Sequence, residues 1–282
     1  MSWQDPLTAS QLGTFQRDGV LILPGFYDLQ ADIEPIQHDI HRLIGQVMKR
    51  HGMTDGREPF APDRFDDGYQ ALIARDRSLG GEVYDAVKQI PAFFRLLGDP
   101  RHESLFKALR PKAIPGIAAG GHGIRIDNPN EERFRAAWHQ EYPSQLRSMD
   151  GLVFWAPLLP ITAELGPVQF CSGSHTAGAL PVFTRDHENH DKTGAYAVRL
   201  KDEAQLLGRY ERIAPLTSPG DLVVIDFLTL HASGLNNSQR SRWSLQFRYF
   251  NFDDPTGLAH GWKGSFAAGV DFRSVHPELC VD

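Results

Sequence analysis

The chain has 282 residues, of which 41% are hydrophobic, 23% are charged and 10% are aromatic. This composition is ordinary for a globular protein and excludes a largely disordered chain. The formal net charge of −6 is mild and the 29 Lys and Arg residues are scattered. The sequence therefore contains no basic face that indicates a nucleic acid or an anionic membrane as partner. We expect one domain, residues 1–282, because single β domains with added helices commonly reach roughly 200–250 residues.

Residues 1–110 are expected to form a mainly helical flank with one early strand. Thr8 is a typical N-cap for a first helix, and the apolar run at residues 20–23 ends at a Pro-Gly turn, which predicts a short buried strand. Apolar spacing predicts further helices over residues 35–49 and 81–90. Because this region is rich in helix signals and the rest is not, we expect the helices to pack on a separate β core.

Residues 111–260 are expected to form that β core. The segments at 116–126, 151–159 and 221–230 are apolar and bounded by turn-forming residues, which is typical of buried strands. Residues 243–252 alternate large apolar and more polar side chains, which predicts a strand with one buried face. We expect this strand to pair with the segment at 221–230.

The cysteine usage and the N-terminal sequence favour the cytoplasm as the location. Cys171 and Cys280 lie far apart, and the N-terminus lacks the basic and apolar regions of a signal peptide. The longest apolar stretch, residues 151–161, contains two prolines and is shorter than the ~20 residues that a membrane helix needs. We therefore expect a cytoplasmic protein without a membrane-spanning segment.

A His-x-Glu motif, His139-Gln140-Glu141, lies at the edge of an expected strand. Side chains two residues apart on an extended chain project from the same face, roughly 6.5–7 Å apart along the backbone, so an imidazole and a carboxylate can bind one ion. His231 directly follows the apolar segment at 221–230 and is the expected third ligand. Two histidines and one carboxylate leave positions on the ion open, which is the arrangement of oxygen-activating ferrous sites.

By itself the His-x-Glu pattern is weak evidence, because a second copy occurs at residues 276–278. That copy has a proline at its centre and neither a strand nor a histidine after it. We interpret it as part of a C-terminal surface tail, residues 261–282.

Arg242 lies eleven residues after His231, across a Gly-Leu-Asn-Asn turn. A connection of that length returns the guanidinium towards the metal, where its planar fork can bind the far carboxylate of a dicarboxylate. Ser233 shares a face with His231 and can donate its hydroxyl to the same carboxylate. These positions together favour a metal site with a bound keto acid.

Other polar residues of the β core allow more than one interpretation. Arg125 and Asp127 alternate on the strand before the metal motif, where they bind a polar substrate, form an internal ion pair or lie at a solvated edge. Arg248 is expected to form a structural ion pair, and His122 is expected to be a loop residue without a role.

Several motifs, in this order and spacing, resemble the phytanoyl-CoA dioxygenase family of iron(II)- and 2-oxoglutarate-dependent oxygenases over most of the chain. The resemblance rests on the opening Gln16 to Phe26, on Trp138-His139-Gln140-Glu141, on Trp155-Ala156-Pro157-Leu158, on Gly173-Ser174-His175, and on His231-Ala232-Ser233-Gly234 followed by Asn236, Arg242 and Arg248-Tyr249. Glu141 stands where the family usually has an aspartate, one methylene shorter.

The resemblance implies a mainly β fold with flanking helices, namely a double-stranded β-helix, which is a jelly-roll or cupin-like barrel. It implies Fe(II), 2-oxoglutarate and O2 as cofactor and co-substrates. The implied roles are metal binding by His139, Glu141 and His231, and co-substrate binding by Arg242, Ser233 and Gln140, with Trp155 nearby.

The reaction that the resemblance implies is oxidative decarboxylation of 2-oxoglutarate to succinate and CO2, coupled to hydroxylation of an unactivated C–H bond of a small-molecule metabolite. Halogenation is disfavoured because Glu141 fills the position that a halide would need. Desaturation, epoxidation and ring formation stay open, as do the substrate and the oligomeric state. A metal-free cupin-like binding protein and a zinc hydrolase, whose ligands are similar, also stay open, although both leave Arg242 and Ser233 unexplained.

Overall fold

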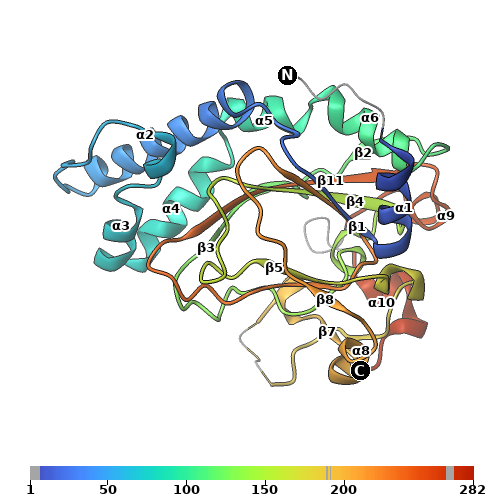
Figure 1. Ribbon diagram of the computed structural model, residues 1–282. Helices are drawn as coiled ribbons and strands as arrows, with labels where there is room; N and C mark the ends of the chain where they lie inside the picture. Colours follow the sequence, from blue (N-terminus) through green and yellow to red (C-terminus); the bar gives the residue numbers. More distant parts are fainter. Residues whose placement is uncertain (1–6, 189, 191, 265–269) are drawn as a thin grey trace.

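The computed structural model describes residues 7–188, 190, 192–264 and 270–282. Helices cover one side of a six-stranded sheet, and a three-stranded sheet lies on its other side (Figure 1). Every strand pair within these two sheets is antiparallel. The protein is therefore a mixed structure of helices and antiparallel sheets.

The N-terminal third is helical, as the sequence predicts. The first helix begins after Thr8, whose hydroxyl accepts a hydrogen bond from the Gln11 backbone N–H at 3.2 Å while the Gln11 side chain accepts from the Thr8 N–H at 2.8 Å. This reciprocal capping satisfies two backbone donors at the helix start. The helices are α1 (Ala9–Asp18), α2 (Glu34–Arg50), α3 (Tyr69–Arg75), α4 (Arg77–Val87), α5 (Pro91–Leu97) and α6 (Pro100–Leu109).

The larger sheet has the strand order β1-β9-β4-β11-β2, and β3 also pairs with β11. One sequence prediction about it is wrong, because the strand near residues 243–252 does not pair with the segment at 221–230. A third strand, β4, lies between them and pairs with both. The strands are β1 (Val20–Leu23), β2 (Pro115–Ile117), β3 (Gly123–Asp127), β4 (Gly151–Pro157), β9 (Leu222–Asp226) and β11 (Arg242–Asn251).

The physical reason is the course of the chain after β9. Residues 227–230 turn away from the larger sheet, and the next strand, β10 (His231–Ser233), joins the smaller one. The chain therefore changes sheets before it returns as β11. β4 lies between β9 and β11, and every one of its residues is buried. Such burial is expected for a central strand that is covered on both faces.

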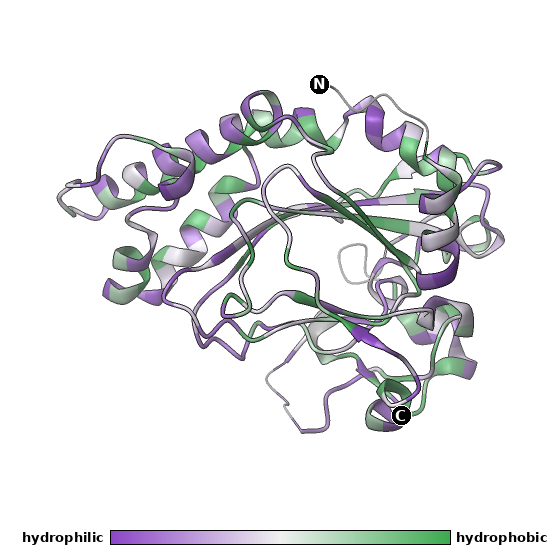
Figure 2. Ribbon diagram, viewed as in Figure 1, coloured by the Kyte–Doolittle hydropathy of each residue, from purple (hydrophilic) through white to green (hydrophobic). Residues whose placement is uncertain are grey.

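Strand β11 sorts its side chains between the two faces of the larger sheet. Trp243, Leu245 and Phe247 belong to the core cluster that includes apolar residues of the helices. The alternate residues Arg242 and Arg248 project to the opposite face, as the period of two of a strand requires. In Figure 2 the central strands are largely hydrophobic while the helices alternate in polarity. The face away from the helices thus carries the polar side chains of the sheet.

The smaller sheet has the order β10-β5-β8, with β5 (Val168–Cys171) and β8 (Arg212–Ile213). A second core cluster joins apolar residues of both sheets, including Trp155 from β4 and Phe170 from β5. Residues 192–216 contain α8 (Glu203–Leu207) and β7 (Arg199–Leu200), and β7 pairs with β6 (Val182–Phe183).

The C-terminal segment is only partly a surface tail. It contains α10 (Phe272–Val275), and the next residue, His276, is buried with its Nε2 2.6 Å from the Tyr142 hydroxyl. The interpretation of the second His-x-Glu copy as surface was therefore wrong for its histidine, which the neighbouring Tyr142 covers. It does not belong to a metal-binding cluster among the described residues.

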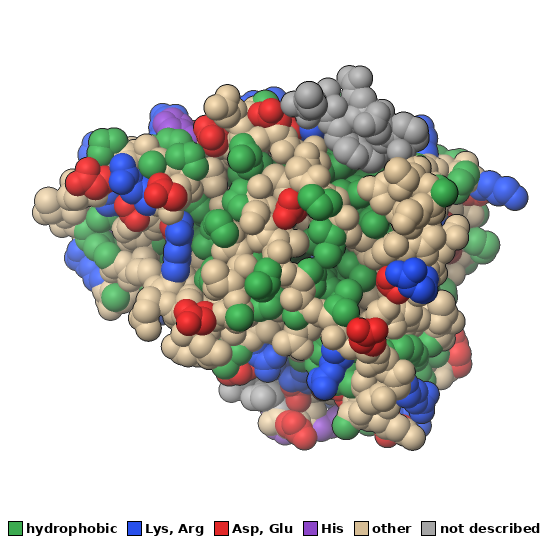
Figure 3. Space-filling model, in the orientation of Figure 1, with side chains coloured by type: hydrophobic (Ala, Val, Ile, Leu, Met, Phe, Trp, Pro, Cys, Tyr) green, Lys and Arg blue, Asp and Glu red, His purple; other side chains and the backbone are tan. Residues whose placement is uncertain are grey.

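On the face shown in Figure 3, acidic and basic side chains are interspersed. Among the helices of the described residues, none is long and apolar enough to cross a membrane.

Candidate metal centre

His139, Glu141 and His231 lie together although two separate stretches of the chain supply them. Their ligand atoms all lie within 4.8 Å of one another. The backbones of His139 and His231 form an antiparallel bridge with two N–H to carbonyl hydrogen bonds of 3.0 Å each. This bridge holds the two imidazole ring centroids 4.2 Å apart. Backbone pairing, rather than side-chain packing alone, therefore brings the separated histidines together.

The protonation state of both histidines suits metal binding. Nδ1 of His139 donates to the Ala137 carbonyl at 2.7 Å, and Nδ1 of His231 donates to the Thr229 carbonyl at 2.9 Å. Since a carbonyl can only accept, the proton is on Nδ1 and the Nε2 lone pair is free. Burial lowers the pKa of His139, and burial together with His139 lowers the pKa of His231 to about 3. Both rings are thus neutral near pH 7.

Glu141 is a buried carboxylate whose two oxygens have different surroundings. Its Oε1 accepts hydrogen bonds from Arg248 Nε at 2.7 Å, Ser144 Oγ at 3.1 Å and Gln145 Nε2 at 3.2 Å. Its Oε2 lies 3.8 Å from His231 Nε2 and receives only a 3.4 Å contact from Arg248 Nη2. Burial opposes ionisation, but Arg248 and the two histidines outweigh it and lower the pKa of Glu141 to about 2.

Glu141 immediately precedes the short helix α7 (Tyr142–Gln145), which explains its donors. Residues three and four positions further along a helix lie on the same side as its first residue. Ser144 and Gln145 therefore donate to the Glu141 carboxylate from α7, while Arg248 donates to it from β11. Oε2 is left as the oxygen that can bind an ion.

Two neutral imidazoles and one carboxylate form a donor set that fits a divalent transition metal. It is the one cluster of this kind in the part of the chain that the structure describes. His139 and Glu141 line two adjacent cavities, one of about 310 Å³ and one of about 60 Å³. An ion bound by the cluster would therefore lie where the two cavities meet.

The smaller cavity contains most of the residues expected to bind the co-substrate. Ser233, Trp155 and Arg242 line it, together with His231 of the metal cluster. Arg242 is 1% exposed, and its Nη2 donates to Ser233 Oγ at 3.0 Å and to Asp127 Oδ2 at 2.8 Å. Its Nη1 donates to the Gly166 carbonyl. Within the described part of the chain, its buried Nε has no hydrogen-bond acceptor.

Arg125 and Asp127 form the internal ion pair that was one of the interpretations of their sequence positions. Arg125 Nη2 lies 2.8 Å from Asp127 Oδ1, so Asp127 is shared between Arg125 and Arg242. Burial opposes ionisation of Asp127, but the two guanidinium groups lower its pKa to about 2. Arg125 also lines both cavities. Two arginines, Arg125 and Arg242, thus lie beside the smaller cavity.

Gln140 differs from the other expected co-substrate residues. Its Nε2 donates to the Gly178 carbonyl at 2.8 Å and to the Leu228 carbonyl at 2.7 Å, and its Oε1 accepts from the Leu180 N–H at 2.8 Å. The alternation of an extended segment directs it away from the face of His139 and Glu141. Its amide is therefore already bonded to three backbone groups.

The structure adds residues that the sequence analysis missed or treated as structural. Arg248 binds the carboxylate of the metal cluster, and Gln145 and Arg147 line the larger cavity. A signal for Arg248 did exist, because it lies an even number of residues from Arg242 on β11 and so shares its face. Gln145 and Arg147 lie in and after a very short helix, for which the sequence has no periodic pattern.

The family model of phytanoyl-CoA dioxygenase (PhyH) matches residues 15–244. The chain is similar to the ectoine dioxygenase of Halomonas elongata, with 25% identity over 267 residues that cover 88% of this chain and 71% of the relative. It is also similar to the ectoine dioxygenase of Bordetella parapertussis, with 25% identity over 270 residues that cover 89% of this chain and 77% of the relative.

Solved structures show the same fold. EctD from S. alaskensis with 2-oxoglutarate and 5-hydroxyectoine has a TM-score of 0.56 at 17% identity, covering 89% of this chain and 78% of that one. The epimerase SnoN in complex with Fe3+, alpha ketoglutarate and nogalamycin RO has a TM-score of 0.55 at 16% identity, covering 93% and 91%. With the family match and the buried His-Glu-His cluster, these findings show that the chain belongs to the phytanoyl-CoA dioxygenase family and is an iron- and 2-oxoglutarate-dependent dioxygenase.

Proposed function

We propose that the chain hydroxylates an unactivated C–H bond of a small-molecule metabolite, with Fe(II) bound by His139, Glu141 and His231. The observation that carries the proposal is the buried cluster of these three side chains at the junction of two cavities. Such a position gives an ion simultaneous access to a co-substrate on one side and to a substrate on the other.

The smaller cavity is the proposed site of 2-oxoglutarate. Arg242 and Ser233 would bind its far carboxylate, and Trp155 would line the site. Among the described residues the buried Nε of Arg242 has no acceptor, and an anionic ligand would supply one. The presence of two arginines, Arg125 and Arg242, in the lining of this cavity also favours an anion. We do not include Gln140, because backbone groups already occupy its amide.

The larger cavity is the proposed substrate site. Its volume of about 310 Å³ is at the lower end of typical small-molecule pockets. The names of the relatives, which are dioxygenases of the small molecule ectoine, support a small-molecule substrate. Arg125 and Asp127 are proposed to shape the wall between the two sites, since Arg125 lines both.

Ferrous iron with 2-oxoglutarate and O2 supplies, when bound, the oxidant for the C–H bond, and succinate, CO2 and the hydroxylated product leave. The side chains prepare the site for this chemistry. The backbone carbonyls of Ala137 and Thr229 keep the two histidine Nδ1 protons in place. Arg248 keeps the Glu141 carboxylate ionised and oriented, and the burial of Glu141 and His231 limits the access of bulk water.

We also propose that the two sheets form a double-stranded β-helix. The support is the apolar core shared by both sheets and the crossing of the chain from β9 to β10 and back to β11. In this arrangement the metal cluster lies at the open end between the sheets, as the adjoining cavities suggest.

The function can be tested by incubating the protein with Fe(II), 2-oxoglutarate and O2 in the presence of metabolite fractions and measuring succinate. We expect at least one fraction to raise succinate release, with one hydroxylated product per succinate. Replacement of Fe(II) by Zn(II), or removal of O2, should stop the release. Conversion of a metabolite without O2 and 2-oxoglutarate would instead indicate a hydrolase and contradict the proposal.

A further inference from the structure

Arg147 is a buried cation in the wall of the larger cavity. Only 8% of the residue is exposed. Its Nη2 donates to the Ala119 carbonyl at 2.6 Å, and its Nη1 donates to Gln145 Oε1 at 3.3 Å. Both acceptors are neutral. Within the described part of the chain, no carboxylate forms an ion pair with it.

The other arginines of this cavity each have a carboxylate partner. Arg125 pairs with Asp127 at 2.8 Å, Arg199 with Asp186 at 2.5 Å, and Arg248 with Glu141 at 2.7 Å. Apart from Arg147, these three are the arginines that line the cavity. Arg147 is thus the arginine of this wall that forms no ion pair with a carboxylate of the described residues.

The surroundings of Arg147 leave little room for a partner from the protein itself. A Cβ at Gly264 would lie 2.6 Å from both Nη1 and Nη2, so a larger residue there would collide with the guanidinium. Residues 265–269, which follow Gly264 in sequence, include no Asp or Glu. Among the described residues, the cavity that Arg147 lines is the direction from which a further partner can reach the guanidinium.

Burying a cation without a counter-charge costs free energy, because its hydration is lost without compensation. Burial alone also lowers the pKa of Arg147, with no acidic group acting on it. A ligand that brings the missing negative charge would offset this cost. A guanidinium has five N–H donors in a fixed fork that matches a carboxylate or a phosphate.

We propose that the larger cavity binds a substrate that carries an oxyanion, either a carboxylate or a phosphate, and that Arg147 binds this group. The position relative to the metal cluster supports this role. Gln145 accepts from Arg147 through Oε1 and donates to Glu141 through Nε2 at 3.2 Å. The side-chain amide of Gln145 therefore lies between Arg147 and Glu141, the proposed metal ligand. An oxyanion on Arg147 would place the carbons next to it on the metal side of the cavity. The assignment of this ligand as the substrate rests on the proposed function.

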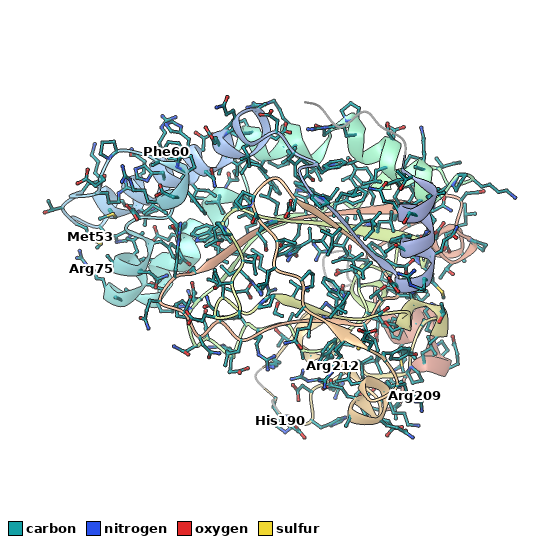
Figure 4. The ribbon with its side chains drawn as sticks, viewed as in Figure 1. Met53, Phe60, Arg75, His190, Arg209 and Arg212 are labelled. Atoms are coloured by element: carbon teal, nitrogen blue, oxygen red, sulfur yellow. The ribbon has the colours of Figure 1, made fainter. Side chains whose placement is uncertain are left out.

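The test measures anion binding and needs neither iron nor turnover. The thermal unfolding midpoint of the metal-free full chain is followed against inorganic phosphate and, separately, against acetate, with chloride keeping the ionic strength constant. The variants are Arg147→Gln, which removes the charge, and Arg147→Lys, which retains it. Arg209→Gln is the matched control, because Arg209 is exposed near the end of α8 at the edge of the molecule (Figure 4).

We expect one of the two anions to raise the midpoint of the wild-type chain by about 3 °C for each tenfold concentration above its Kd. Arg147→Gln should lose most of this rise, Arg147→Lys should keep part of it, and Arg209→Gln should behave like wild type. The anion with the larger effect identifies the group as carboxylate or phosphate. Without added anion, Arg147→Gln should be no less stable than wild type, because it removes an unbalanced buried charge.

The proposal is overturned if neither anion stabilises the wild-type chain, or if Arg147→Gln responds as strongly as wild type. A large loss of stability in Arg147→Gln without anion would also overturn it, by showing that Arg147 is a structural residue. Because the protein is metal-free, failure of the iron and 2-oxoglutarate assignment would leave these outcomes unchanged. The two failures can therefore be told apart.

Discussion

Arg248 Nε lies 2.7 Å from Glu141 Oε1, and this ion pair leaves Oε2 of the same carboxylate beside His231. Glu141 stands at a position where the family usually has an aspartate, whose side chain is one methylene shorter. The longer side chain has more rotamers, and these must be restricted if one conformation is to dominate. Arg248, Ser144 and Gln145 all donate to Oε1 and so restrict it. We interpret these donors as the means by which a glutamate presents a single oxygen to the metal.

Substitution of Arg248 should therefore weaken metal binding. In Arg248→Gln the carboxylate loses its strongest donor, and we expect the affinity for Co(II), followed by its visible absorption, to fall by about 10–100-fold. Arg248→Lys should restore part of the loss. If Arg248→Gln binds Co(II) as tightly as wild type or more tightly, the arginine competes with the metal for Glu141 instead of orienting it.

Shortening the ligand should also weaken metal binding, even though aspartate is the usual residue. In Glu141→Asp the carboxylate retracts from Oε1 donors that are placed for a glutamate. We expect a loss of Co(II) affinity of about tenfold or more, in the range typical of changes around metal ligands. Equilibrium dialysis measures it. Tighter binding by Glu141→Asp would show that the surroundings are not matched to the longer side chain.

Arg242 should be needed for the keto acid and much less for the metal. Loss of a buried charge-assisted pair costs about 2–5 kcal/mol, so Arg242→Ala should raise the Kd for 2-oxoglutarate at least about thirtyfold. Arg242→Lys is the matched comparison, because it keeps the charge but loses the planar fork of donors. Its Kd for 2-oxoglutarate should lie between those of wild type and Arg242→Ala. Calorimetric titration of the metal-loaded proteins gives these constants. An unchanged Kd in Arg242→Ala would place the co-substrate elsewhere.

His102 should make the stability of the protein depend on pH. It is fully buried, its Nε2 lies 2.7 Å from the Tyr27 hydroxyl, and burial lowers its pKa to about 4. In the unfolded chain its pKa is about 6.5. Between these values the unfolded state binds a proton that the folded state does not. Acidification from pH 6.5 towards pH 4 should therefore destabilise the fold by about 1.4 kcal/mol per pH unit through this residue.

The contribution of His102 is the difference between wild type and His102→Phe, measured by urea unfolding at several pH values without metal. A phenylalanine suits the site because His102 packs against the rings of Phe154 and Phe247. The unfolding free energy of wild type should fall steadily relative to that of His102→Phe as the pH falls below 6.5. A difference that is constant between pH 6.5 and pH 4 would mean that folding does not lower the pKa of His102.

The sequence was sufficient for the parts of the site that depend on local geometry. His139 and Glu141 follow from the two-residue period of an extended segment, and His231 and Arg242 from their spacing around one connection. The pairing of β11 could not be predicted, because the choice between β4 and β9 depends on where the chain leaves the larger sheet between β9 and β10. Local patterns contain no information on such a crossover.

Arg248 and Arg147 show the same limit at the level of single residues. Whether an arginine is a surface charge, an ion-pair partner or a ligand-binding group depends on what lies opposite it. The partner of Arg248 is 107 positions away in sequence, and the acceptor of Arg147 in the 119 loop is 28 positions away. Only the folded chain places these groups together.

An anaerobic titration with Fe(II) and 2-oxoglutarate tests the metal site most directly. Family chemistry leads us to expect a weak visible charge-transfer band when both are added to wild type, reaching its maximum at one Fe(II) per chain. The band should be absent in His231→Ala, in which only two ligands remain. A wild-type protein that stays colourless at saturating Fe(II) and 2-oxoglutarate, or a His231→Ala variant with an unchanged band, would contradict the account.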